Sequence, residues 1–132
     1  MISKKIGVDL HGVIDDDITF FKGLLEIFYF ASIEIYVISG PPVKDIEQEL
    51  EEYGFKKGLH YQHVASVVDH LKNKGVQMWI GQEGTWWASD DEWWSAKAEI
   101  CDNKNIDLMI DDSEEYEKAF KKIRTKFLLY TS

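Results

Sequence analysis

The chain of 132 residues is long enough for one domain with its own hydrophobic core and too short for two ordinary domains. Its formal net charge of -9 argues against binding to a nucleic-acid polymer, and its 45% hydrophobic residues argue against disorder. The single cysteine excludes an internal disulfide, and no apolar stretch is long enough to cross a bilayer. We therefore expect a cytoplasmic protein without a membrane partner.

The first half of the chain is predicted to contain two strands, each followed by a helix. Apolar runs at residues 4–10 and 33–38 end in turn residues, as buried parallel strands do. The helix after the second strand is expected to begin at Pro41-Pro42 and to end at Gly54. The helix between the two strands is indicated by apolar side chains at three- and four-residue spacing, namely Phe20, Phe21, Leu24, Leu25 and Phe28.

The second half is predicted to contain a third strand and a hairpin before the last strand–helix units. Residues 61–65 alternate as in a strand and lead into a helix that ends at Gly75. Residues 77–87 are typical of a hairpin, because a glycine-containing turn separates two aromatic-rich runs. The remaining predicted elements are a helix over 91–102, a strand that ends at Asp111, a helix capped by Ser113 and a last strand over 126–130.

Strands that alternate with helices in this way indicate a mainly parallel sheet that is covered on both faces. The sequence therefore predicts the α/β class, with one Rossmann-like domain over residues 1–132 that has three layers and about five strands. The tryptophan-rich hairpin is expected to be a small insertion around residues 75–95.

Polar residues follow three of the predicted strands at the point where each strand ends. Asp9 follows the first strand, Ser39-Gly40 the second, and the pair Asp111-Asp112 a later one. In an open α/β sheet, ligands bind beyond the carboxyl ends of such strands. We therefore expect a reactive site at this edge of the sheet.

The order of these residues resembles the motifs of the haloacid dehalogenase-like (HAD) phosphohydrolase superfamily. The first family motif, a strand followed by Asp-x-Asp-Gly-Thr/Val, is similar to Asp9-Leu10-His11-Gly12-Val13, and the second motif is similar to Ser39. The third motif is a lysine on a helix, which Lys97 matches best because its helix leads directly into the acidic strand; Lys72 and Lys74 compete for this role. The fourth motif is a strand that ends in an acidic pair, as at Asp111-Asp112.

The resemblance implies a HAD-like fold with a minimal cap and a Mg²⁺-dependent phosphohydrolase. Its substrate would be a small phosphate monoester, such as a nucleotide, and its intermediate an aspartyl-phosphate at Asp9. The implied catalytic residues are Asp9, His11, Ser39 and Lys97. The implied phosphate contacts are Ser39, Gly40 and Lys97. The implied Mg²⁺ ligands are Asp9, the backbone carbonyl of His11 and Asp112, with Asp111 in the same cluster.

Position 11 departs from the family pattern, because phosphatases of the family usually have a second aspartate there that protonates the leaving group. An imidazole with an ordinary pKa of about 6.5 can also transfer protons near neutral pH, so His11 is the predicted acid/base group. A protonated imidazole beside Mg²⁺ is electrostatically unfavourable. The alternative is therefore a weak or inactive HAD-like protein that binds metal, phosphate or a partner.

The tryptophans and the remaining polar clusters have simpler interpretations. The tryptophans are expected to pack the hairpin onto the sheet or to form a homo-oligomer interface. The less favoured alternative is that they form a lid whose aromatic faces stack on a substrate ring. The aspartate run at residues 15–17 is expected at a solvated helix entrance, and the other histidines are not expected to bind metal. The tryptophans in question are Trp86, Trp87, Trp93 and Trp94, and the histidines are His60, His63 and His70.

Overall fold

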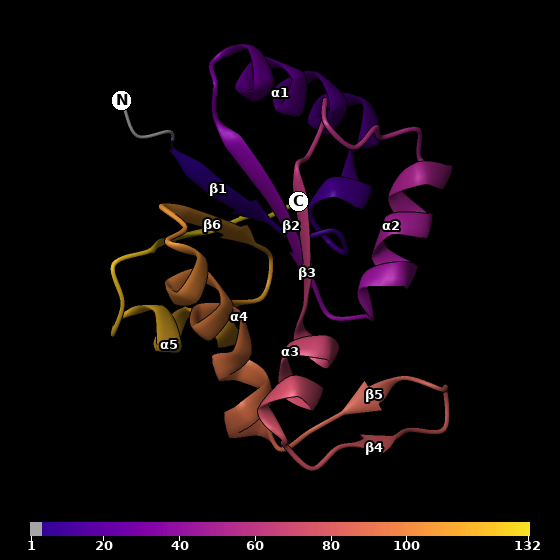
Figure 1. Ribbon diagram of the computed structural model, residues 1–132, viewed down its shortest axis with the longest axis vertical. Coiled ribbons are helices and arrows are strands. Elements are labelled where there is room, and N and C mark those ends of the chain that lie inside the picture. Colours follow the sequence, from indigo (N-terminus) through magenta and orange to yellow (C-terminus); the bar gives the residue numbers. More distant parts are fainter. Residues whose placement is uncertain (1–3) are drawn as a thin grey trace.

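The computed structural model describes residues 4–132 and confirms the predicted α/β class. Its five-stranded sheet is parallel throughout and has the strand order β3-β2-β1-β6-β7 (Figure 1). The three strands whose ends carry polar residues, β2, β1 and β6, are therefore neighbours. The strands are β1 (Lys5–Val8), β2 (Glu34–Ser39), β3 (His63–Ser66), β6 (Leu108–Asp111) and β7 (Lys126–Leu129).

Helices cover both faces of this sheet because its strands alternate between two apolar sides. In β2, Ile35 and Val37 pack with α1 and α2, whereas Tyr36 and Ile38 pack with α4 and α5. Helix α3 lies against α4 through Val67 and Leu71. The α-helices are α1 (Ile18–Phe30), α2 (Val43–Glu52), α3 (Val67–Lys74), α4 (Asp90–Lys104) and α5 (Glu117–Phe120), and the 3₁₀ turns are η1 (Ile14–Asp16) and η2 (Glu114–Tyr116).

Most predicted helix boundaries are confirmed, and two details are wrong. Gly54 and Gly75 follow α2 and α3 with left-handed φ values of +85° and +84°, as expected of residues that end a helix. Ser113 does not cap the next helix with its side chain. Its N–H instead donates to Asp111 at 3.0 Å, and the segment forms only η2 and the short α5. Phe20 is 56% exposed because the buried side of α1 is centred on Phe21 and Leu25.

The predicted hairpin is confirmed as the antiparallel pair β4 (Trp79–Ile80) and β5 (Trp86–Trp87). It projects beyond α3 and α4 (Figure 1), and it does not pack onto the sheet as the sequence suggested. Its flanking residues Met78 and Ala88 join the apolar cluster between those helices, and Lys72 lies over the Trp86 ring at 3.8 Å. Among residues 4–132, no helix has the length and apolar character to cross a membrane.

Candidate active site

The carboxyl ends of β1 and β6 bring Asp9, Asp111 and Asp112 together, and Ser39 ends the neighbouring β2. Val8 is in register with both Val37 and Ile110, so β2, β1 and β6 end at the same level. The Asp9 N–H also donates to the carbonyl of Ile110 at 3.0 Å. Carboxylate oxygens of the three aspartates lie within 4.8 Å of one another, and we call this group the acidic cluster.

Lys97 is the lysine that reaches the acidic cluster. It projects from the middle of α4 and is only 2% exposed. Its Nζ lies 2.5 Å from Asp111 Oδ2 and 3.3 Å from Asp9 Oδ1. The two competing lysines lie elsewhere, since Lys72 covers Trp86 and Lys74 pairs with Glu92 and Glu99.

The buried charges of this site shift one another's protonation. Burial by itself lowers the pKa of Lys97, but Asp9, Tyr116 and Asp111 together raise it above its ordinary value, so Lys97 stays a cation. Burial raises the pKa of Asp9 to about 6, against the opposing effects of Lys97 and of a hydrogen bond with Ser39. Burial and the neighbouring Asp111 raise the pKa of Asp112. One lysine therefore faces three carboxyl groups.

The three aspartates differ in how much of their hydrogen-bonding capacity is already used. Asp111 accepts from Lys97 at one oxygen and from the Ser113 N–H at the other. Asp112 is exposed, and the loop after β1 passes directly against it. A Cβ at Gly12 would lie 2.0 Å from Asp112 Oδ2, and the φ of +87° at Gly12 also favours glycine. Asp111 thus has both carboxylate oxygens hydrogen-bonded, whereas the ion pair of Asp9 with Lys97 is longer, at 3.3 Å, and involves only Oδ1.

The loop after β2 is held in place beside the acidic cluster. Ser39 is 1% exposed, and the Gly40 carbonyl accepts hydrogen bonds from the Val68 N–H at 3.1 Å and from Ser66 Oγ at 3.4 Å. Gly40 also faces an aromatic wall, because a Cβ there would lie 3.6 Å from Cζ2 of Trp93. Ser39 and Gly40 therefore lie at the same edge of the sheet as the acidic cluster, and Ser39 is hydrogen-bonded with Asp9.

Aromatic side chains from α4 and η2 form the wall on this side of the site. Tyr116 is buried, as expected, and its ring centroid lies 4.4 Å from Lys97 Nζ. Trp94 packs edge-on against Tyr116, and Trp93 contacts Trp87 of the hairpin with ring centroids 5.4 Å apart. Burial raises the pKa of Tyr116 to about 12, so its hydroxyl remains protonated at neutral pH.

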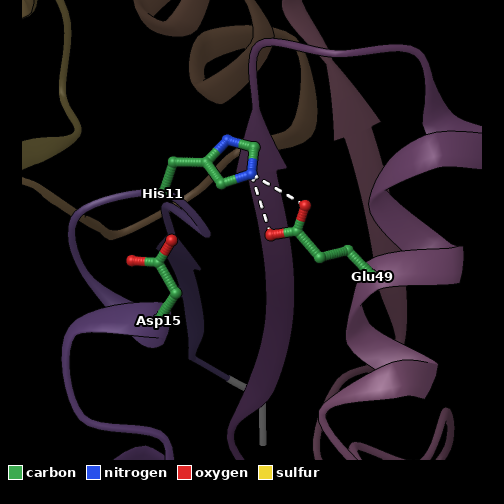
Figure 2. Close-up of side chains that lie close together, drawn as sticks. All are labelled: His11, Asp15 and Glu49. Atoms are coloured by element: carbon green, nitrogen blue, oxygen red, sulfur yellow. Dashed lines mark hydrogen bonds and ion pairs between the residues drawn. The ribbon is translucent and has the colours of Figure 1, made fainter.

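His11 lies in a second group of side chains, shown in Figure 2. Its Nε2 lies 2.8 Å and 3.0 Å from the two carboxylate oxygens of Glu49 on α2. Asp15 of η1 approaches the same place, and the three side chains each offer a ligand atom within 4.8 Å of the others. We call this group the His11 cluster. The imidazole is therefore directed at α2 through Glu49, and it is not one of the groups that form the acidic cluster.

Sequence reasoning missed two members of the His11 cluster. The aspartate run predicts a solvated helix entrance for Asp15, although its position four residues after His11, in a run beside the first motif, is a usable signal. Glu49 had no such signal, because it is 38 residues from His11 and meets it only through the packing of α2. The rest of the aspartate run behaves as expected, since Asp17 caps α1 by accepting from the Phe20 N–H.

Comparison with solved structures found a similar chain, an uncharacterized protein from Corynebacterium glutamicum. The two chains are 16% identical with a TM-score of 0.60, and the match covers 99% of this chain and 87% of that chain. No protein-family model and no curated protein matched the chain. At this level of identity, the similarity supports the α/β fold alone.

Proposed function

We propose that the protein is a Mg²⁺-dependent phosphohydrolase of the HAD type, which acts on a small phosphate monoester through Asp9. One observation carries the proposal: the acidic cluster lies at the ends of β1 and β6, with buried Lys97 beside it and buried Ser39 at the end of the neighbouring β2. Phosphoryl transfer requires a nucleophile and groups that neutralise the phosphate oxygens. This arrangement supplies both kinds of group.

The donor set of the acidic cluster fits Mg²⁺. Hard divalent cations prefer oxygen ligands, and three carboxyl groups converge here against a single lysine. Because Asp111 is already hydrogen-bonded at both oxygens, Asp9 and Asp112 would hold the ion, together with the backbone carbonyl of His11. When bound, Mg²⁺ would offset the negative charge of the phosphate oxygens.

In the proposed reaction, a carboxylate oxygen of Asp9 attacks phosphorus and the ester P–O bond breaks. The leaving alkoxide takes a proton from solvent water and departs as the alcohol. A water molecule then hydrolyses the aspartyl-phosphate, which releases inorganic phosphate and restores the Asp9 carboxylate. With a pKa of about 6, Asp9 is mostly ionised at neutral pH and can act as the nucleophile. Ser39 donates a hydrogen bond to a phosphate oxygen, and Lys97 keeps the adjacent carboxylates ionised.

The test is hydrolysis of a panel of phosphate monoesters, including nucleotides, in the presence of Mg²⁺. We expect phosphate release that stops with EDTA and with Asp9→Asn, but not with Asp102→Asn, an exposed position on α4. Release that continues in Asp9→Asn would contradict the assignment of Asp9 as nucleophile. Aspartyl-phosphate trapped on Asp9 and detected by mass spectrometry would support it directly.

The hydrogen bonds of His11 favour a second candidate function, a protein that binds Mg²⁺ and phosphate without turnover. A general acid must reach the leaving oxygen, whereas His11 Nε2 is engaged by Glu49 on α2. This second function predicts Mg²⁺ and phosphate binding that Asp112→Asn weakens, with no ester of the panel hydrolysed. The phosphate-release assay therefore separates the two functions.

A further inference from the structure

All four histidines of the chain pair with a glutamate through Nε2, and one of them differs from the others. Among residues 4–132, only the His11 pair has a third potential metal ligand within reach, Asp15, whereas Glu99 of the His70 pair is shared with Lys74. A histidine–glutamate contact is therefore ordinary in this protein, and the third ligand is what needs an explanation. The four pairs are His11–Glu49, His60–Glu26, His63–Glu34 and His70–Glu99.

The three side chains of the His11 cluster come from separate elements that hold them in place. Asp15 lies in η1, where its Oδ1 accepts from the Gly12 N–H at 2.7 Å. Glu49 lies on α2, which is anchored by Ile46 and Leu50 in the core. His11 lies in the loop between β1 and η1 (Figure 2). Side chains held by three elements give a preorganised donor set.

The charges of the His11 cluster are not balanced by a basic side chain. In the described part of the chain, neither Asp15 nor Glu49 forms an ion pair with a lysine or arginine, in contrast to Lys97 in the acidic cluster. Within residues 4–132, the His11 ring is hydrogen-bonded to Glu49 but not to Asp15. The carboxylate of Glu49 also raises the pKa of the neighbouring Tyr53. The group is thus suited to a cation.

We propose that His11, Asp15 and Glu49 bind a second divalent cation, of the first transition row and similar to Zn²⁺. One imidazole nitrogen and two carboxylates are the mixed donors that such ions accept, whereas Mg²⁺ prefers oxygen alone. Three protein ligands leave coordination positions for water. The two sites select their ions by ligand type.

The two sites are adjacent along the chain but separable. Gly12 connects them, because its N–H donates to Asp15 while its Cα faces Asp112. No residue has its side chain in both clusters. The second site does not depend on the proposed phosphohydrolase activity, and it can be tested in a protein whose Mg²⁺ site has been removed.

The experiment is a titration of the full chain, labelled with ¹⁵N-histidine, with Zn²⁺ alone. We expect one equivalent of Zn²⁺ to shift the Nε2 resonance of His11, while the other three histidines serve as internal references. The shift should persist in Asp112→Asn, which lacks a ligand of the acidic cluster. It should need at least about tenfold more Zn²⁺ in Asp15→Asn and in Glu49→Gln, since each loses a charged ligand.

Glu34→Gln is the matched control, because it alters a histidine–glutamate pair that has no third ligand. It should leave the Zn²⁺ dependence of His11 unchanged. Asp15→Asn keeps an oxygen that can accept from Gly12, so it tests the ligand charge with the turn retained. The proposal is overturned if Zn²⁺ leaves the His11 resonance unmoved, if Asp112→Asn abolishes the shift, or if the two ligand variants titrate like wild type. None of these results depends on phosphate release.

Discussion

The acidic cluster and the His11 cluster are joined by one short loop, yet they carry their charges in different ways. Asp9 and Asp111 are 5% and 0% exposed and share a lysine that is itself buried. In the His11 cluster the imidazole is 46% exposed, and no lysine accompanies the carboxylates. An ionised buried carboxylate destabilises the fold unless a cation is paired with it, whereas an exposed one is screened by water.

This difference assigns Lys97 two roles. It compensates Asp9 and Asp111 in the folded chain, and in the proposed reaction it lies beside the nucleophile. Changes to the acidic cluster should therefore alter stability strongly, and changes to the His11 cluster should alter it weakly. The following predictions test that contrast.

The largest effect is expected from Lys97→Met. The variant leaves two buried carboxylates without their cation, and breaking a buried pair in this way costs about 3–5 kcal/mol. Urea unfolding at pH 7 measures the loss, with the exposed Lys118→Met on α5 as the control. The loss should shrink at acidic pH, where the carboxyl groups take up protons. A loss below about 1 kcal/mol at pH 7 would mean that Lys97 is not the counter-charge.

Asp9→Asn should stabilise the protein in the absence of divalent cations. Burial raises the pKa of Asp9 from 3.8 to about 6, so between these values the folded chain keeps a proton that the unfolded chain has lost. Stability therefore falls as pH rises through this window, by up to about 3 kcal/mol for a shift of this size. Asparagine has no carboxyl group to ionise, so Asp9→Asn does not lose stability in this pH window.

Urea unfolding of wild type and Asp9→Asn, with EDTA at pH 4, 5, 6 and 7, checks the direction of this stability change. The stability gained by Asp9→Asn should grow from pH 4 to pH 7, while Asp102→Asn should show no such trend. A variant that is less stable than wild type at pH 7 would reverse the expected direction. It would indicate that the ionised carboxylate contributes more through Lys97 than it loses by burial.

The same contrast explains which parts of the site the sequence could predict. Asp9, Ser39 and Asp111 were predictable because parallel strands place their carboxyl ends at one edge, whatever the details of packing. Lys97 was predictable as the lysine of the site because its helix, α4, directly precedes β6. The hydrogen bonds of His11 were not predictable, because they depend on the course of the loop beyond Asp9 and on the rotation of α2.

The fold itself was predictable where the apolar pattern was strong, as in the continuous apolar runs of β1 and β2 and the apolar stripe of α2. The prediction was wrong at Ser113, where a hydrogen bond from the backbone N–H replaced a side-chain cap, and at Phe20, an apolar residue that faces outward. The hairpin was recognised from its turn, but its packing partners were not. Those partners, α3 and α4, are set by the tertiary arrangement of the chain.

Gly12→Ala should affect both stability and Mg²⁺ binding, because Gly12 is in contact with the acidic cluster. The change places a Cβ 2.0 Å from Asp112 Oδ2 at a φ of +87°. Gly58→Ala is the matched control, since Gly58 has a φ of +93° and open space around it. The control measures backbone strain alone, about 1–2 kcal/mol.

We expect Gly12→Ala to lose more stability than Gly58→Ala and to weaken Mg²⁺ binding measured by calorimetry, because Asp112 must move. The control should keep the Mg²⁺ affinity of wild type. Equal losses of stability and equal Mg²⁺ affinities in the two variants would show that the loop after β1 does not position Asp112.

The smallest effect is expected for the His11–Glu49 pair. Exposed ion pairs contribute roughly 0–1 kcal/mol, so a double-mutant cycle of His11→Ala and Glu49→Gln should give a coupling energy in that range without added metal. If the second cation site exists, the coupling should increase when Zn²⁺ is present, because both side chains then bind one ion. A coupling of 3 kcal/mol or more without metal, as expected only of buried pairs, would remove the contrast between the two clusters.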